Sequence, residues 1–343
     1  MTSPLLELPG AVPPPEGSTD PGVAWHHGDP LREQRAAECD VVVVDRSYRA
    51  VLAVPGEDRL SWLHTITSQH LRTLDEGAHT EALVLDGQGR VEHHAVVSHI
   101  DGTVWLDTEP GRAAGLLAYL QQMVFWSKVA PRDATAELAV LSLLGPSTGR
   151  LLAQVGELGG FVRTREAQTD LLVPRSELTT AWQRLVDAGA TPAGSWAYEA
   201  LRVAGLRPRL GLDTDERTIP HEVGWVGPAV HLDKGCYRGQ ETVARVANLG
   251  RPPRRMVLVH LESPETLPST GDPVRAGDRV VGRVGTVVTH HELGPIALVL
   301  LKRSVEPDTP LLAGDAAASV DPDSVPPDTG EPPGRAALRR LRA

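Results

Sequence analysis

The chain has 343 residues, of which 41% are hydrophobic and 23% are charged, and its formal net charge is −10. This composition is typical of a globular protein long enough for two or three packed units. The acidic balance argues against a broad nucleic-acid surface, so nucleic acid is not an expected partner. No stretch of the sequence approaches the roughly 18 consecutive apolar residues that a membrane span requires, and no membrane partner is expected.

Cysteine usage predicts the compartment. Cys39 and Cys236 are the two cysteines of the chain, too few for a disulfide framework. They are also too few to hold an iron–sulfur cluster, which usually takes four thiolates. The first residues lack the charged and apolar regions of a signal peptide. We therefore expect a reducing, cytoplasmic location.

The hydrophobic pattern predicts the organisation of the chain in order. Residues 1–22 are rich in Pro, Gly and Ser and are expected to be disordered. A body over 23–250 follows, with repeated helix–strand–strand–strand–helix units. Strands are expected near 41–44, 49–54, 80–85, 91–100, 103–107, 137–144 and 170–173, and helices near 57–66, 111–125, 150–158 and 176–188. This pattern indicates an α+β fold of two related subdomains, in which helices cover antiparallel sheets.

The last part of the chain changes character after Pro252-Pro253. Short strand-like runs separated by glycines predict a small β-barrel over 251–314. The Asp-, Pro- and Ala-rich segment 315–343 is expected to be a disordered tail.

The stretch Lys234–Glu241 places a thiol, two cations, an aromatic ring, an amide and a carboxylate within eight residues, and it reads Lys-Gly-Cys-Tyr-Arg-Gly-Gln-Glu. Gly235 and Gly239 permit tight turns and a close approach of a ligand. Lys234 and Arg238 would stabilise Cys236 as a thiolate, the reactive form of cysteine. The alternative is a helix-capping loop that buries an inert cysteine. Residue types alone leave both interpretations open.

Two other motifs are weaker. Gly145–Gly149 satisfies G-x-S-x-G between a strand and a helix, as a nucleophile elbow does, but its Ser and Thr fit a helix N-cap better. Histidine pairs occur at 26–27, 93–94 and 290–291. Adjacent residues on a strand point to opposite faces, so such a pair would not converge on one ion, although one member could face a pocket. Without HExxH or paired CxxC motifs, no metal site is predicted.

The stretch 234–241 resembles the signature K-G-C-Y-x-G-Q-E of the YgfZ family at all seven specified positions, and 243–245 also fits. Residues 201–206 and 218–222 are similar to the "R-x-E-x-G … P-x-E" region of the glycine-cleavage T-protein, and 282–288 with 296–298 resemble its terminal barrel. The resemblance covers roughly 40–305. It implies a GcvT/YgfZ-like fold around a central folate pocket, tetrahydrofolate as cofactor, and a role in the assembly or repair of iron–sulfur clusters.

The candidate folate-pocket positions implied by this resemblance are His93, His94, Trp196 and Val203. The T-protein carries its catalytic Asp in a span that matches Gly89–His94, where an imidazole replaces the permanent anion. Aminomethyl transfer is therefore not expected. Val203 aligns with the glutamate that contacts the pterin, and an unpaired pterin edge costs about 1–3 kcal/mol. Trp196 would either stack on a ring or pack in the core.

The resemblance makes Cys236 the functional thiol, forming a transient bond with a cluster, a sulfur species or a partner cysteine. Tyr237 would pack the loop, and Gln240 and Glu241 would fix its shape by hydrogen bonding. The expected partners are iron–sulfur proteins or their assembly factors, together with folate. Two alternatives are a folate-dependent aminomethyl or one-carbon transferase, and a binding module without chemistry.

Overall fold

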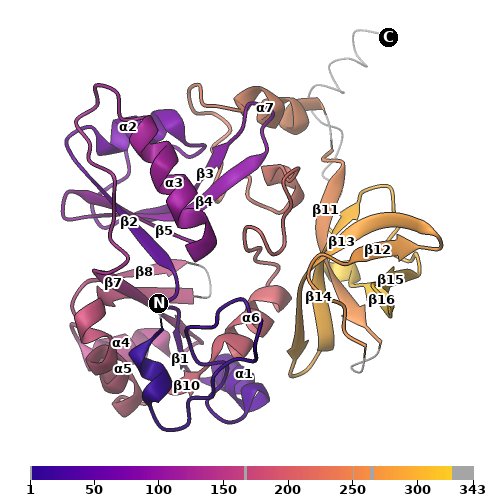
Figure 1. The fold of residues 1–343 in the computed structure, drawn as a ribbon, viewed down its shortest axis with the longest axis horizontal. Coiled ribbons are helices and arrows are strands. Elements are labelled where there is room, and N and C mark those ends of the chain that lie inside the picture. Colours follow the sequence, from indigo (N-terminus) through magenta and orange to yellow (C-terminus); the bar gives the residue numbers. More distant parts are fainter. Residues whose placement is uncertain (1, 166–167, 250, 263–265, 327–343) are drawn as a thin grey trace.

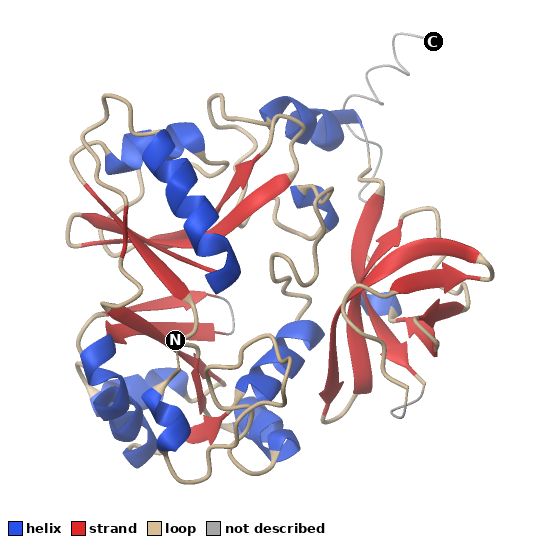
Figure 2. Cartoon of the chain, viewed as in Figure 1, coloured by secondary structure: helices blue, strands red, loops and turns tan. Residues whose placement is uncertain are grey.

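The computed structural model describes residues 2–165, 168–249, 251–262 and 266–326. Two five-stranded sheets with covering helices form the body, and a closed six-stranded barrel lies beside it (Figure 1). Helices gather on the body, whereas the barrel is built mainly of strands (Figure 2). The expected α+β fold class, with antiparallel sheets, helices and a C-terminal barrel, is confirmed.

The first sheet has the strand order β3-β4-β5-β2-β6 and is antiparallel throughout. Its strands are β2 (Ala50–Pro55), β3 (His79–Leu85), β4 (Val91–Ile100), β5 (Thr103–Thr108) and β6 (Arg132–Asp133). Helices α2 (Arg59–Ile66) and α3 (Pro110–Gln122) pack on this sheet. Leu63, Leu116 and Leu120 are buried in their shared core, as their helical spacing predicts.

The second sheet has the order β10-β1-β7-β9-β8. Its strands are β1 (Val42–Asp45), β7 (Leu138–Leu144), β8 (Phe161–Arg165), β9 (Gln168–Pro174) and β10 (Thr191–Ala193), and its helices include α4 (Thr148–Val155) and α5 (Leu178–Asp187). The valine run of β1 is buried on both faces, because Val43 packs in one hydrophobic core and Val42 and Val44 pack in another on the opposite side of the sheet. The β1–β10 pair is parallel, an exception to the expected antiparallel pattern.

Three further helices and the barrel complete the chain. The helices are α1 (Pro30–Cys39), α6 (Ser195–Ala204) and α7 (Gln240–Leu249). The barrel order is β11-β14-β13-β12-β15-β16, with bounds Arg254–Leu261, Gly294–Lys302, Arg279–His290, Pro273–Ala276, Leu311–Ala313 and Ala316–Val320. Short 3₁₀ turns lie at Pro4–Glu7, Arg175–Glu177, Pro220–Glu222 and Pro322–Ser324. The barrel docks on α6, where Arg202 donates to the Thr286 hydroxyl at 2.6 Å.

Both segments expected to be disordered contain ordered structure. Near the N-terminus, Leu5 is buried in the core of the second sheet, and Ser3 donates a 2.5 Å hydrogen bond to buried Asp45. Near the C-terminus, β16 pairs with both β11 and β15 and closes the barrel. The order of both segments could not be predicted from composition, because it comes from tertiary contacts rather than from a periodic sequence pattern. Residues 327–343 of the predicted tail lie outside the described residues.

A buried ion network joins the two sheets. Asp107 of β5 pairs with Arg49 and with Arg163 of β8. Arg163 also pairs with Asp170 of β9 at 2.9 Å. Asp107, Arg163 and Asp170 are almost completely buried. Because each charge has an opposite partner, the network ties the two subdomains together without leaving a lone buried ion.

Candidate functional site

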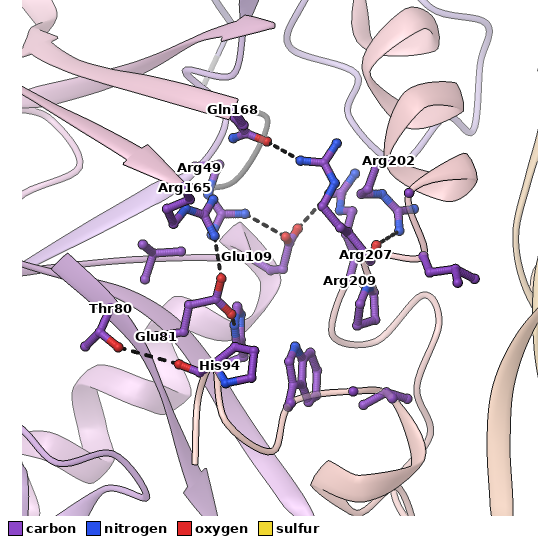
Figure 3. Close-up of a pocket in the computed structure, with 18 of the residues that line it drawn as sticks. Arg49, Thr80, Glu81, His94, Glu109, Arg165, Gln168, Arg202, Arg207 and Arg209 are labelled. Carbon is purple, nitrogen blue, oxygen red and sulfur yellow. Dashed lines mark hydrogen bonds and ion pairs between the residues drawn. The ribbon is translucent and has the colours of Figure 1, made fainter. Parts of the chain in front are cut away.

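A cavity of about 430 Å³ lies where the two sheets meet α6 and the segment that follows it (Figure 3). The strands contribute Glu81, His94, Arg165 and Gln168, and the segment after α6 contributes Arg207 and Arg209. The volume falls within the usual range for small-molecule sites, about 300–1,000 Å³. The cavity is therefore large enough for a small ligand, and its lining combines charged side chains with apolar ones.

Most charges around the cavity neutralise one another. Arg49 and Arg209 pair with Glu109 at 2.7 and 2.6 Å, and Arg165 pairs with Glu81 at 2.5 Å. Burial alone would raise the pKa of Glu81, but its bonds to His94 and Arg165 hold that pKa down at about 2. Both carboxylates are ionised at neutral pH and already occupied by cations.

Arg207 is the exception among these guanidinium groups. It donates to the Gln168 side-chain oxygen at 2.7 Å, and no ion pair to it is found among the described residues. Burial lowers the pKa of Arg207, because no nearby carboxylate offsets its desolvation. Arg207 is thus the lining cation best placed to accept an anionic group of a ligand.

The histidine pair on β4 divides between two environments. His94 stacks on Trp225, with ring centroids 4.9 Å apart and planes 10° from parallel, and its Nε2 lies 2.8 Å from Glu81. Its ring therefore faces the cavity. His93 instead lies under α3, where a Cβ added at Gly115 would come 3.0 Å from its ring. Burial, with a smaller effect of Arg112, lowers the pKa of His93 to about 4.

The other two candidate pocket positions lie elsewhere. Val203 is completely buried in the core beneath the cavity and does not line it. Trp196 stacks on Trp25 at 4.5 Å, and its Nε1 donates to the Thr289 carbonyl at 3.4 Å. Of the four predicted positions, His94 alone lines the cavity. Trp225 and Arg207 were missed, although the three arginines in 202–209 were a visible signal.

Cys236 is exposed, so the alternative of a buried, inert cysteine is wrong. The predicted electrostatic activation is not seen either. The ammonium of Lys234 is buried and donates to the backbone carbonyls of His64 and Thr67 at the end of α2. Arg238 pairs with Glu92 at 2.9 Å. Both cations are engaged by other groups, and burial lowers the pKa of Lys234 to about 8.

The cysteine loop is held from both sides. Tyr237 is buried, with the Lys234 ammonium 4.8 Å from its ring centroid. Gln240 donates to the Lys234 carbonyl at 3.1 Å. Glu241 does not fix the loop as expected, because it is exposed and pairs with Arg245 along α7. These contacts fix the backbone on either side of Cys236 while its thiol faces solvent.

The loop also rests on the turn between β3 and β4. Gly239 has φ of +83°, and a Cβ there would lie 2.6 Å from the Asp86 carbonyl oxygen and 2.9 Å from the Gly89 Cα. Glu92, which pairs with Arg238, lies two residues before His94 on β4. One strand therefore supports the cysteine loop at its start and contributes to the cavity further along.

Two family models match parts of the chain: the GCVT N-terminal domain over residues 23–171, and the CAF17 C-terminal beta-barrel domain over residues 254–327. The fold and the cavity therefore define a protein with a GcvT-like body and a CAF17-type barrel. In line with this, the chain superimposes on the glycine cleavage system aminomethyltransferase T of Bartonella henselae with a TM-score of 0.77. That match has 17% identity and covers 92% of this chain and 94% of the other, a likeness of fold alone.

Two sequence relatives are similar to the chain over most of its length. The chain is 27% identical to the Arabidopsis thaliana protein named "Putative transferase At1g60990, chloroplastic", over 71% of this chain and 61% of that protein. It is 28% identical to the aminomethyltransferase of Rubrobacter xylanophilus, over 77% of this chain and 75% of the relative. The match thus spans less than two thirds of the Arabidopsis protein. Among the described residues, no helix is long and apolar enough to cross a membrane.

Proposed function

We propose that this chain is a YgfZ-like accessory protein that supports assembly or repair of iron–sulfur proteins through Cys236. The observation that carries the proposal is the exposed thiol of Cys236 on a loop whose backbone is anchored by Lys234, Gly239 and Gln240. A fixed backbone with a solvent-facing thiol suits transient coordination of iron or contact with a client protein. The cluster is the cargo here, because two cysteines per chain, only one of them in the loop, are too few to hold it permanently. The cytoplasmic location stays a prediction.

The central cavity supports a tetrahydrofolate-type ligand as the second part of this proposal. The stacked His94–Trp225 pair borders the cavity and offers aromatic surface to a ring system. Arg207 would bind a carboxylate of the ligand by donating hydrogen bonds to it. A folate would supply a one-carbon carrier when bound, while these side chains bind and orient it. Val203 does not line the cavity, so its side chain offers no contact to a ligand bound there.

Isothermal titration calorimetry with tetrahydrofolate tests this second part. We expect binding to the full chain and at least a tenfold weaker affinity for Arg207→Gln, because the substitution removes the charge but leaves donors near Gln168. Arg150→Gln is the matched control, since Arg150 is an exposed arginine that pairs with Asp40 away from the cavity. If the Arg207 variant and the wild type bind tetrahydrofolate with equal affinity, Arg207 does not contribute to the binding site.

A folate-dependent aminomethyl transferase is the second candidate, favoured by the name of the Rubrobacter relative. The cavity argues against it. The side chains that β4 presents there are His94 and Val96, neither of which is a carboxylate. The carboxylates Glu81 and Glu109 are held by cations. No free carboxylate is therefore offered to a cationic amine by these residues. A tetrahydrofolate-dependent glycine cleavage assay distinguishes the two: we expect no turnover, and turnover by this chain would favour the transferase.

A further inference from the structure

A second constellation lies where the barrel meets the first helix of the body. His290 ends β13, and His291 begins the turn to β14. Glu38 reaches them from α1, and its Oε1 lies 2.8 Å from the Nε2 of His291. One ligand atom from each of the three side chains lies within 4.8 Å of the other two, the only such group among the described residues. Strand alternation does not separate these two histidines, because the strand ends between them.

The surroundings fix this group before any ion binds. Gln34, one turn before Glu38 on α1, accepts the backbone N–H of His291 at 2.9 Å and donates to the Thr289 carbonyl at 3.2 Å. The backbone of the turn is therefore locked to the helix. The His290 residue is 6% exposed and the His291 side chain 2%, whereas that of Glu38 is 42% exposed. Two ordered imidazoles thus face a carboxylate that solvent can reach.

We propose that Glu38, His290 and His291 bind a divalent transition-metal ion of the Zn²⁺ class, linking the barrel to α1. Two imidazoles and one carboxylate form a ligand set that Zn²⁺ accepts, with water as the fourth ligand. This nitrogen-rich set suits borderline metals and disfavours Mg²⁺ and Ca²⁺, which take oxygen ligands. The site is distinct from the central cavity, because none of its three residues lines that cavity.

Binding of an ion by His290 would disrupt hydrogen bonds that its ring already makes. Its Nδ1 accepts the backbone N–H groups of Glu292 and Leu293 at 3.2 and 3.3 Å. An ion that binds Nδ1 replaces these two long bonds, and an ion that binds Nε2 moves the ring proton to Nδ1 and also disrupts them. His291 has no such constraint, since its Nε2 faces only Glu38 among these residues. When an ion binds the Nε2 of neutral His291, the ring proton moves to Nδ1, so the imidazole stays neutral.

Zinc titration of the full chain against a chromophoric chelator tests the site. The wild type should bind one Zn²⁺ tightly, and Glu38→Gln and His291→Ala should each bind at least tenfold more weakly. His290→Asn is a conservative third variant, because the amide oxygen can still accept the turn N–H groups. The control is His260→Ala, which removes another barrel histidine paired with a carboxylate, Asp321 at 3.3 Å, but with no third ligand nearby in the described part of the chain. It should bind like the wild type.

Two results would overturn the proposal: no tight Zn²⁺ binding by the wild type, or equal binding by the wild type and Glu38→Gln. The Glu38 variant is decisive if His291→Ala fails to fold, because Glu38 is partly exposed and its amide keeps a hydrogen bond to the ring. A thermal melt gives a second readout. Zn²⁺ should raise the melting temperature of the wild type and of His260→Ala, but not that of Glu38→Gln.

Discussion

Gly235 and Gly239 both lie in the loop around Cys236, but only the position of Gly239 requires a glycine. Gly239→Ala should destabilise the protein by about 1–3 kcal/mol, because its positive φ disfavours a side chain and the new Cβ would meet the Asp86 carbonyl. Gly235→Ala is the matched control: a Cβ there meets open space, so the change should stay within about 0.5 kcal/mol. Urea unfolding measures both, and equal losses would contradict this description of the loop.

Single residues were also where sequence reasoning was least reliable. Alternation along a strand correctly separates His93 from His94, because β4 is regular there. The rule does not apply to His290–His291, because the strand ends between them. Sequence likewise placed Lys234 beside the thiol, whereas its long side chain reaches two carbonyls of a distant helix end. Side-chain direction in a loop depends on tertiary contacts that local pattern does not contain.

At the scale of elements, the buried ions between β5, β8 and β9 should contribute strongly to stability. Asp107→Asn leaves Arg49 and Arg163 without their shared carboxylate, and we expect a loss of about 3–5 kcal/mol. The control is Glu57→Gln, which breaks an exposed pair with Lys128 and should cost less than about 1 kcal/mol. Both values come from urea unfolding. A small loss for Asp107→Asn would mean that the network is dispensable.

Long, strongly periodic elements could be predicted from sequence, and elements defined by pairing could not. The strands at 91–100 and 103–107 and the helix at 111–125 agree with β4, β5 and α3 to within a few residues. The helix α1, the short parallel strand β10 and the final strand β16 were missed. The strands β10 and β16 are five residues or fewer, and they are ordered by neighbours that lie far away in sequence.

For the whole molecule, buried and half-buried histidines predict a loss of stability in mild acid. Burial is the largest cause that lowers the pKa of His27, His64, His93 and His221, each to about 4. Their unfolded value is about 6.5. Between about pH 6.5 and 4 the unfolded chain therefore binds more protons than the folded one, and the free energy of unfolding falls as pH falls. Above pH 6.5 this contribution is fully present.

The variant His93→Leu isolates one of these groups. Its free energy of unfolding should decline less steeply than that of the wild type between pH 6.5 and 4, because it lacks one imidazole that charges on unfolding. Comparing the two proteins cancels the opposite contribution of buried acids such as Asp45, whose pKa burial raises. Parallel pH profiles would show that His93 does not titrate on unfolding.

The central claim is that function resides in the exposed thiol of Cys236, and the chain provides its own control. Cys39 is also exposed, at the end of α1 and outside the loop. The most direct measurement is the activity of iron–sulfur enzymes in a host lacking its own copy of the protein, complemented with each variant. Cys39→Ala should restore that activity. Cys236→Ala should fold and bind tetrahydrofolate like the wild type but leave the enzymes severalfold less active, and full activity with Cys236→Ala would contradict the claim.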